Sequence, residues 1–281
     1  MTAPPAVAVL GLGEAGAAIA TDIGAAGNRV LGFDPAQPAP ETIEGLSDPA
    51  DAARSAAIVL SVNSAAVALE VAEAVAPALN ESQLYADLNT TAPALKRAIA
   101  AAVQSGGAAF ADVALMEPVP DWGVRTPALA SGPGAERFAA AFARFGMPVT
   151  VVGAEPGAAA ARKLARSVFM KGQAAAIGEA LEAARRLGCE DWLYANIEST
   201  LAAADGRLVR RLVEGSRRHA GRRVDEMAAA VAMLEELEVE PRVAAASEAW
   251  LRSLAVSVRS PVRPNLCSSR ARFGCRTTHC T

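Results

Sequence analysis

The stretch VAVLGLGEAGAAIATDIGAAGNRVLGFD, residues 7–34, decides the fold. It predicts a strand, a glycine-rich turn, an alanine-rich helix and a second strand in close succession. Gly11, Gly13 and Gly16 give the turn the spacing G-x-G-x-x-G. In that context the first glycine permits the tight turn, the second lets a pyrophosphate approach the backbone, and the third lets the helix pack against the sheet. The stretch therefore predicts a dinucleotide-binding unit whose phosphates meet the helix N-terminus.

An acidic residue stands at the end of the second predicted strand, where the adenosine ribose of a dinucleotide is expected. The Asp34 carboxylate can accept hydrogen bonds from the ribose hydroxyls and repels a 2'-phosphate. Pro35, Ala36 and Gln37 come next, so no arginine follows directly to bind such a phosphate. The sequence therefore favours NAD, with NADP as the alternative. A purely structural interpretation stays open, in which the glycines only serve the turn and Asp34 is an ordinary cap.

Short apolar runs alternate with alanine-rich helical segments from residue 6 to about residue 152. Strands separated by helices require crossover connections and a mostly parallel sheet with helices on both faces. We therefore expect an α/β fold, with a Rossmann-type doubly wound, mostly parallel sheet followed by an all-helical C-terminal domain. The strand candidates are VAVLG, RVLGFD, AAIVLSV, QLYADL, AAFADVAL and PVTVVG.

The second half of the chain has helical patterns without strand patterns. A proline-free, alanine-rich run predicts one long helix from about Gly157 to Leu187, and further helices are expected at 190–204, 207–237 and 241–256. The segment after them is rich in arginine, contains prolines and has no periodicity, which is typical of a disordered tail. The expected domains are 1–153 for dinucleotide binding, 154–256 for a helical domain and 257–281 for the tail.

Composition limits the class of partner. The chain has 281 residues, a formal net charge of -3 at pH 7 and 52% hydrophobic residues, which favours a globular protein that binds small molecules and no nucleic acid. No apolar run approaches the roughly 20 residues that cross a bilayer, so we expect no membrane and a cytoplasmic location. Cys189 precedes three cysteines near the C-terminus, a spacing that favours neither a disulfide framework nor a metal site.

A lysine pattern lies on the predicted long helix. In GAAAARKLARSVFMKG, Lys163 is followed one helical turn later by Ser167. The order Gly157-x-Ala159-x-x-x-Lys163-x-x-x-Ser167, together with the GLGEAG turn, resembles the β-hydroxyacid dehydrogenase family, which includes the 3-hydroxyisobutyrate and 6-phosphogluconate dehydrogenases. The resemblance covers residues 6 to about 255, and its C-terminal part is similar to a phosphogluconate-dehydrogenase-like subgroup.

The resemblance implies an NAD(P)-dependent oxidoreductase with its active site between the two domains and a homodimer formed through the helical domain. It implies that Lys163 exchanges the proton of the substrate hydroxyl and that Ser167, where the family has asparagine, orients it. Lys171 is the competing base, and a solvated helix lysine is the structural alternative for Lys163. The expected cofactor-binding residues are Gly11, Leu12, Gly13, Glu14, Ala15, Gly16, Asp34, Asn63, Asn89 and Thr90.

One segment near the expected nicotinamide has two interpretations. In DLNTTAP, the family has D-x-S-T before a helix, which implies that Asn89 and Thr90 border the nicotinamide and the substrate. Thr90 and Thr91 can equally be an N-cap of the helix that Pro93 begins.

The loop after the fifth predicted strand departs from the family pattern. Where the family has D-A-P-V-S-G-G, this chain has Asp112-Val-Ala-Leu-Met116-Glu117-Pro118, so the backbone donors for a substrate carboxylate are missing. Either the substrate anion is bound elsewhere, or the substrate offers a hydroxyl or an amine to Glu117, or Glu117 is a surface acid. We expect Met116, Glu117 and Lys171 to contact the substrate.

A row of arginines is the other candidate for binding an anion. Arg211, Arg218 and Arg222 recur at helical spacing within the helix predicted at 207–237. Such a row can bind phosphate or carboxylate groups, or it can be a solvated helix face.

The expected function is hydride transfer between a nicotinamide and a small hydroxy-acid-like substrate, which is anionic or phosphorylated. An imine reductase of the same fold is the first alternative, because Glu117 could pair with an amine, although such enzymes usually lack the lysine. A dinucleotide-binding protein without catalysis is the second alternative.

Overall fold

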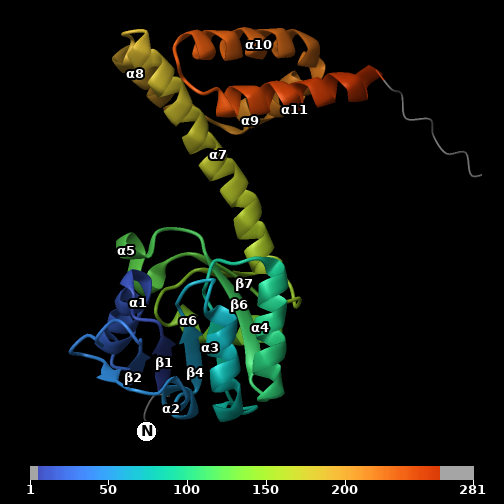
Figure 1. Ribbon diagram of the computed structural model, residues 1–281. Coiled ribbons are helices and arrows are strands. Elements are labelled where there is room, and N and C mark those ends of the chain that lie inside the picture. Colours follow the sequence, from blue (N-terminus) through green and yellow to red (C-terminus); the bar gives the residue numbers. More distant parts are fainter. Residues whose placement is uncertain (1–5, 260–281) are drawn as a thin grey trace, which may run out of the picture. The chain divides into compact units, whose positions relative to one another are not determined.

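The computed structural model describes residues 6–259 (Figure 1). The chain divides into two compact units, of which the first ends at Met170 and the second begins at Lys171.

An eight-stranded sheet forms the centre of the first unit, with the strand order β3-β2-β1-β4-β5-β6-β7-β8. All neighbouring strands pair in parallel except β6 and β7. The predicted doubly wound, mostly parallel sheet is therefore confirmed. The strands are β1 (Val7–Leu10), β2 (Val30–Phe33), β3 (Glu44–Gly45), β4 (Ile58–Ser61), β5 (Leu84–Asp87), β6 (Ala109–Leu115), β7 (Ala128–Ser131) and β8 (Val149–Val151).

Helices cover both faces of this sheet (Figure 1). Successive strand residues point to opposite faces, so Val7 and Val9 of β1 join one core while Ala8 and Leu10 join the other. The first core also contains side chains of α1, α5 and α6, and the second contains side chains of α2, α3 and α4. The helices are α1 (Glu14–Ala25), α2 (Pro49–Arg54), α3 (Ala68–Val75), α4 (Pro93–Ser105), α5 (Val119–Trp122) and α6 (Ala135–Ala143), with short 3-10 turns at Ala76–Ala78 and Gly123–Arg125.

The carboxyl ends of the central strands bring several loops to one edge of the sheet. The chain runs from β1 to β2 in one direction across the sheet and from β3 to β4 in the other, so the order reverses between β1 and β4. Ligands of open parallel sheets bind at this reversal, outside the carboxyl ends of the strands. The glycine turn after β1 and the loops after β4, β5 and β6 all lie at this edge.

The second unit is helical, as predicted. Its core is small and contains Ala183, Leu234, Val239 and Ala244. The Glu179 carboxylate accepts hydrogen bonds from the first amides of the last helix and so joins it to the long one. The helices are α7 (Ala158–Arg186), which crosses from the first unit, α8 (Glu190–Ala202), α9 (Gly206–Arg218), α10 (Ala220–Glu236) and α11 (Arg242–Arg259).

Three expectations about this half need correction. The single helix predicted at 207–237 is wrong, because the chain leaves helical geometry at His219 between α9 and α10. Arg222 therefore belongs to a different helix from Arg211 and Arg218, and there it pairs with Glu226. The tail was predicted to begin at residue 257, but α11 continues to residue 259. Residues 260–281 lie outside the described part of the chain.

In the described part of the chain, none of the helices combines the length and the apolar character that a bilayer crossing requires.

Candidate active site

The glycine turn joins β1 to α1 by a close approach of backbone to backbone. Gly11 has a φ of 105°, and a side chain there would place its Cβ 2.3 Å from the carbonyl oxygen of Val62. A Cβ at Gly16 would lie 1.9 Å from the carbonyl oxygen of Gly11. These two glycines are therefore required for folding, since no side chain fits between the backbones.

Gly13 differs from the other two glycines of the turn. It is the N-cap of α1 with a φ of -63°, and a Cβ built on it would meet nothing within 4 Å. No side chain caps this helix end, so its first N–H groups face the open space beside Gly13. An anion is stabilised at such an end by the N–H groups and by the helix dipole. The geometry fits the pyrophosphate of a dinucleotide.

Asp34 is held at the end of β2 by three backbone donors. Its Oδ2 accepts from the N–H of Leu12 at 2.7 Å, and its Oδ1 accepts from Ala36 at 2.8 Å and Gln37 at 3.0 Å. Burial raises the pKa of Asp34, but these N–H groups outweigh it and hold the pKa below the ordinary 3.8. The carboxylate is therefore ionised at neutral pH, and Oδ2 keeps a lone pair for a further donor.

Two pockets meet along the glycine turn. The first, called the Asp34 pocket, has a volume of about 520 Å³, and the second, called the Lys163 pocket, has about 460 Å³. Because they share Gly13, Val62, Asn63 and Ser64, one extended ligand can occupy both. The Asp34 pocket is lined by Leu10, Gly11, Gly13, Phe33, Asp34, Pro35, Pro49, Val62, Asn63, Ser64, Val67, Glu70, Val71 and Ala74. The Lys163 pocket is lined by Gly13, Glu14, Ala15, Val62, Asn63, Ser64, Ala65, Leu88, Asn89, Thr90, Leu115, Glu117, Val119 and Lys163.

Lys163 lies half-buried in its pocket. Its Nζ donates a hydrogen bond to Oγ1 of Thr90 at 2.8 Å. Since this hydroxyl oxygen accepts from the lysine, its own hydrogen can point to a substrate or cofactor atom. The N-cap interpretation of Thr90 and Thr91 is wrong, because the N-cap of α4 is Ala92 and no side chain caps that helix.

Two asparagines present unpaired acceptors beside the lysine. The side-chain oxygens of Asn63 and Asn89 are buried and have no hydrogen-bond partner among the described residues. The amide nitrogens of both side chains donate to the hydroxyl of Ser61, which fixes their orientation. Buried acceptors are normally paired, so these two oxygens fit the amide donors of a nicotinamide.

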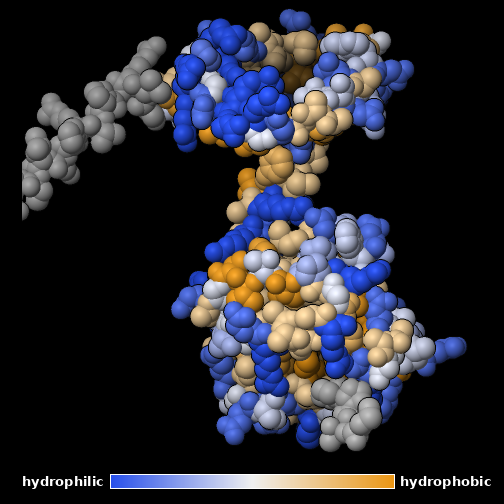
Figure 2. Space-filling view, turned by 180° about the vertical axis from the view of Figure 1, so that it is seen from behind, coloured by the Kyte–Doolittle hydropathy of each residue, from blue (hydrophilic) through white to orange (hydrophobic). Residues whose placement is uncertain are grey.

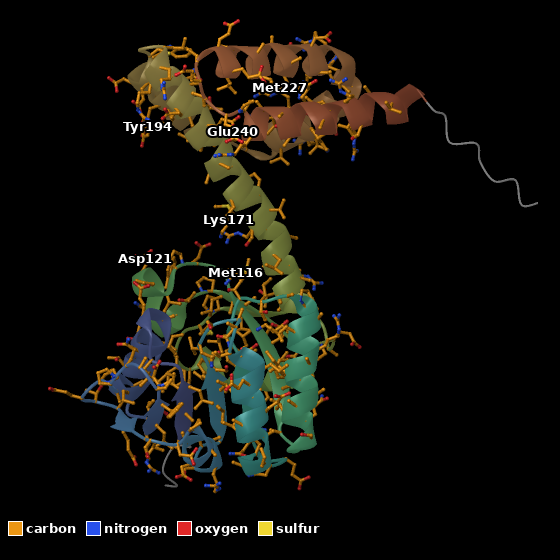
Figure 3. The ribbon with its side chains drawn as sticks, in the orientation of Figure 1. Met116, Asp121, Lys171, Tyr194, Met227 and Glu240 are labelled. Carbon is orange, nitrogen blue, oxygen red and sulfur yellow. The ribbon has the colours of Figure 1, made fainter. Side chains whose placement is uncertain are left out.

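The loop after β6 is tied to the long helix by an arginine. Arg166 donates to the carbonyl oxygen of Met116 at 2.6 Å and to Oε1 of Glu117 at 3.0 Å. The N–H of Met116 already donates to the carbonyl oxygen of Pro127, and Pro118 has no N–H. This loop therefore offers no convergent backbone donors for a carboxylate, and Met116 lies at the carboxyl edge of the sheet (Figure 3).

The structure brings together most of the residues singled out in the sequence. Glu14, Ala15, Asn63, Asn89, Thr90, Glu117 and Lys163 line one pocket, and Gly11 and Asp34 line the other. Leu12 and Gly16 are buried and shape the turn. Ser167 is half-buried one turn beyond Lys163, and neither it nor Met116 lines the Lys163 pocket. Lys171 is exposed at the start of the second unit.

Sequence reasoning missed apolar residues of both pockets, such as Val62, Val67 and Leu88. Val62 and Leu88 directly follow β4 and β5, so their positions after predicted strands could have indicated them. Among residues 6–259, no three histidine, cysteine or acidic side chains gather where they could hold a metal ion.

Two parts of the chain match known domain families. Residues 6–116 match the NAD binding domain of 6-phosphogluconate dehydrogenase, and residues 184–254 match a domain of unknown function, DUF1932. An uncharacterised 28.5 kDa protein of Methanothermus fervidus is 28% identical over 177 residues, which are 63% of this chain and 67% of that protein.

Solved structures extend the comparison to most of the chain. A conserved protein of unknown function, described as similar to 3-hydroxyacid dehydrogenases, is 28% identical with a TM-score of 0.58, covering 89% of this chain and 98% of that one. An imine reductase of Myxococcus stipitatus, crystallised with NADP+, is 20% identical with a TM-score of 0.79, covering 90% and 95%. A variant of that reductase was crystallised with NAD+.

Residues 6–116 thus form an NAD-binding domain like that of 6-phosphogluconate dehydrogenase, and the fold of the chain is similar to that of a 3-hydroxyacid-dehydrogenase-like protein and of imine reductases. The resemblance to the β-hydroxyacid dehydrogenase family, carried in the sequence by the glycine turn and the lysine pattern, is confirmed by the two matched domains and the dehydrogenase-like structure.

Proposed function

We propose that this chain is an NAD(P)-dependent oxidoreductase that transfers a hydride between the nicotinamide and a carbon bearing a hydroxyl group on a small hydroxy-acid-like substrate. The observation that carries the proposal is the place of Lys163, whose ammonium is bonded to Thr90 in the pocket that also contains the N-terminus of α1. A bound nicotinamide supplies the hydride acceptor or donor at C4.

The chain's own residues supply proton transfer and orientation. In the oxidation direction, the neutral amine of Lys163 takes the proton of the substrate hydroxyl, and in the reduction direction the ammonium returns it to the carbonyl oxygen. Thr90 keeps the Lys163 Nζ at one place, and its own hydrogen can donate to the substrate oxygen. Asn63 and Asn89 orient the nicotinamide through their unpaired oxygens. Ser167 stays a proposed orienting residue.

The loop after β6 restricts the substrate. A 3-hydroxy acid whose carboxylate needs backbone donors finds none at Met116 and Pro118. Arg166 neutralises Glu117, so the anionic end of a hydroxy acid is not repelled there and can share the guanidinium. We therefore propose Glu117 and Arg166 as the contact for the substrate's polar end.

Imine reduction is the second candidate, because two carboxylates, those of Glu14 and Glu117, line the Lys163 pocket. Because Arg166 neutralises Glu117, it is the Glu14 carboxylate that favours a cationic substrate, such as an iminium ion. The fold similarity to imine reductases agrees with this alternative.

A substrate panel tests the proposed function and separates the two candidates. Plain and phosphorylated hydroxy acids are offered with NAD or NADP, and cyclic imines with NADH or NADPH, while nicotinamide absorbance is followed. We expect turnover with hydroxy acids. Turnover with imines alone would favour imine reduction, and cofactor binding without turnover of either class would favour a dinucleotide-binding protein without catalysis.

Asp34 is expected to make the protein prefer NAD. An ionised carboxylate repels the 2'-phosphate, so we expect the wild type to bind NAD at least about tenfold more tightly than NADP. Asp34→Ser is expected to bring the two dissociation constants together, measured by titration of intrinsic fluorescence. Asp51→Asn removes the same charge from an exposed position of the same unit and is the control. Equal affinities in the wild type would contradict this role of Asp34.

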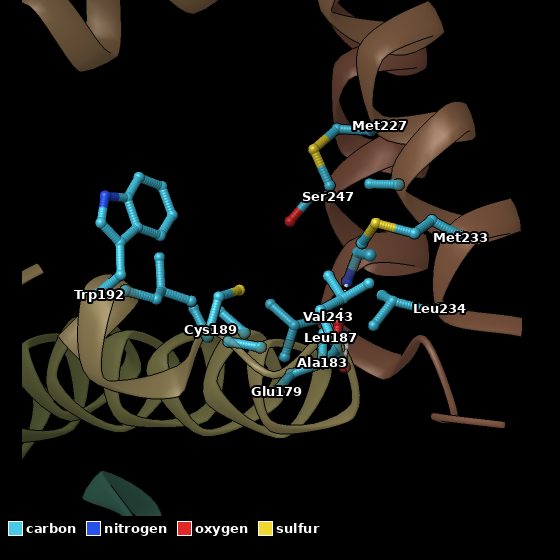
Figure 4. A pocket seen from close by; sticks show the side chains of 16 residues that line it. Glu179, Ala183, Leu187, Cys189, Trp192, Met227, Met233, Leu234, Val243 and Ser247 are labelled. Carbon is cyan, nitrogen blue, oxygen red and sulfur yellow. Dashed lines mark hydrogen bonds between the residues drawn. The ribbon is translucent and has the colours of Figure 1, made fainter. Parts of the chain in front are cut away.

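We also propose that the chain forms a homodimer through its helical unit. The proposal is supported by large apolar side chains at the surface of this unit, including Trp192, 67% exposed, and Tyr194, 61% exposed. Figure 2 shows hydrophobic residues among the hydrophilic ones on the surface of this unit. An apolar groove of about 370 Å³ continues this surface, with Trp192 on one side and Met227 and Met233 on the other (Figure 4). Exposed apolar areas of this kind are typical of an interface.

The mass in solution tests the dimer. Light scattering after size exclusion is expected to give twice the 28.7 kDa of one chain. Trp192→Glu is expected to shift the mass to that of one chain, because a buried charge at the interface is costly. Trp122→Glu, which alters an exposed tryptophan of the first unit, should leave the mass unchanged. A wild type that stays monomeric at high concentration would contradict the proposal.

A further inference from the structure

A lysine is completely buried in the first unit, away from the pocket surface. Lys96 lies on α4, its side chain is 0% exposed, and its Nζ has three oxygen contacts. It donates to the carbonyl oxygen of Asp87 at 2.8 Å and lies 2.9 Å from Oδ2 of Asp87 and 3.1 Å from Oδ1 of Asp112. The first contact is a hydrogen bond and the other two are ion pairs, so both buried carboxylates lie against the same ammonium.

Asp112 uses its other oxygen to hold the start of α7. The Oδ2 atom accepts from the N–H of Gly157 at 3.0 Å, from the N–H of Ala160 at 3.1 Å and from the hydroxyl of Ser131 at 3.0 Å. The Ser131 hydroxyl oxygen in turn accepts from the N–H of Ala159. A carboxylate at a helix N-terminus satisfies free amides and complements the helix dipole. This end of α7 lies about one turn before Lys163.

Asp87 uses its other oxygen to hold the loop that carries the partner of Lys163. Its Oδ1 accepts from the backbone N–H of Asn89 at 3.2 Å and from the Asn89 side-chain amide. The next residue is Thr90, whose hydroxyl accepts the hydrogen bond from Lys163. The helix that carries the lysine and the loop that carries its acceptor are therefore both anchored to one ammonium.

We infer that Lys96 is a positioning residue of the active site, which with Asp87 and Asp112 fixes the Lys163 ammonium against Thr90. The expected effect of Lys96 on turnover rests on the proposed function. The placement of Lys163 itself can be measured without turnover.

The energetics of the cluster favour a role in geometry over one in stability. The carboxylates of Asp87 and Asp112 share one ammonium in a site buried from solvent. Burial raises the pKa of Asp87, although Lys96 and Asn89 favour its charged form. Buried ionic clusters of this kind are often no more stable than apolar side chains of similar volume, because desolvation offsets the attraction. If Lys96 served only for packing, an apolar side chain would do equally well. Holding both Asp87 and Asp112, and through them the loop at Asn89 and the start of α7, requires a charged side chain.

Acetylation of lysines measures the placement directly. The chain contains three lysines, Lys96, Lys163 and Lys171, so trace labelling with acetic anhydride followed by peptide mass spectrometry resolves each one. Lys171 is exposed and serves as the internal reference. In Lys96→Met the side-chain length is kept and the charge is lost. We expect the labelling ratio of Lys163 to Lys171 to rise about fivefold, because Lys163 leaves Thr90 more often.

Kinetics on the same variant measure the consequence. With a substrate found in the panel, kcat is expected to fall about tenfold or more through misplacement of the lysine. The KM for NAD is expected to change much less than kcat, because the cluster contacts Asn89 beside the expected nicotinamide but neither Gly13 nor Asp34, which are expected to bind the pyrophosphate and the ribose. A general loss of structure would instead change both constants together.

The control is Gln83→Met. Gln83 is buried before β5, at the opposite edge of the sheet, where it bonds to the carbonyl oxygens of Ala53 and Ala56. Its loss is expected to lower the melting temperature without altering the labelling ratio or kcat.

Each outcome decides the inference. A folded Lys96→Met protein with a wild-type labelling ratio and wild-type kcat would overturn it. Should Lys96→Met not fold, Ser131→Ala replaces it as the test, because it removes one oxygen between Asp112 and Ala159. In Ser131→Ala, a raised labelling ratio of Lys163 to Lys171 supports the inference, and an unchanged labelling ratio overturns it. If no substrate is turned over, the proposed function fails, while the labelling ratio still decides the placement of Lys163.

Discussion

Replacement of Lys163 with alanine is expected to lower kcat about 10³-fold, the size of effect typical for loss of a general acid or base. The affinity for NAD is expected to stay near that of the wild type, because the glycine turn and Asp34 make their contacts without this side chain. Steady-state turnover with the best substrate of the panel measures kcat, and fluorescence titration with NAD measures the affinity for the cofactor.

Arg162→Ala is the matched control for this variant. Arg162 precedes Lys163 on α7, is exposed and donates only within its own helix, to the carbonyl oxygen of Ala158. Its replacement removes a positive charge of the same helix turn and is expected to leave kcat within about twofold. A Lys163→Ala protein that keeps kcat within about tenfold of the wild type would show that the proton goes elsewhere.

Gly13→Val is expected to weaken NAD binding about 100-fold or more while the protein folds as before. The backbone at Gly13 suits any residue and the space beside it is open, so the fold accepts the side chain. The added carbons then occupy the place where the pyrophosphate must approach the N–H groups of α1. Thermal unfolding without cofactor and titration with NAD measure the two effects.

Gly16→Ala is expected to show the opposite pattern. Its Cβ would lie 1.9 Å from the carbonyl oxygen of Gly11, so α1 must move away from β1. We expect the free energy of unfolding to fall by about 2 kcal/mol or more, as for other overpacked sites.

One outcome would contradict the role of Gly13. If Gly13→Val binds NAD as the wild type does, the pyrophosphate is not bound at the N-terminus of α1.

The parts of the fold that follow from sequence are those with strong local patterns. The apolar runs of β1, β2, β4, β5 and β6 predicted strands because nearly all of their residues are buried on both faces. The run of β8 is less buried and predicted a strand through its β-branched residues. The segment ALAS of β7 has no β-branched or aromatic residue, and β3 contains only two residues, so neither carries a local signal. β7 is a strand because β6 and β8 pair with it on both sides.

The break between α9 and α10 had only a weak signal in the sequence. No proline stands at His219, although Gly215 and Gly221 flank it and the apolar pattern is interrupted between Val213 and Val224. The helices separate there because α10 turns back to pack along α11, a tertiary contact that local preference does not contain.

The site was predictable where spacing reflects chemistry. The glycine turn and Asp34 could be found from sequence because each stands at a fixed distance from a predicted strand. The pattern around Lys163 was found through its resemblance to the β-hydroxyacid dehydrogenase family, and its role stays a proposal. Lys96 was missed because it precedes Arg97 and resembles a solvated charge. A signal was present, since Lys96 shares the spacing of the buried Ile99, Ala100 and Val103 on one helix face, where a charge requires a buried partner.

The crystal structure of the NAD complex tests the central claim most directly, through the distance between nicotinamide C4 and the Nζ of Lys163. We expect the nicotinamide to lie in the Lys163 pocket, with C4 about 5 Å from Nζ, so that a hydroxyl carbon fits between hydride acceptor and base. A nicotinamide bound outside this pocket, or with C4 more than about 8 Å from Nζ, would contradict acid–base catalysis by this lysine.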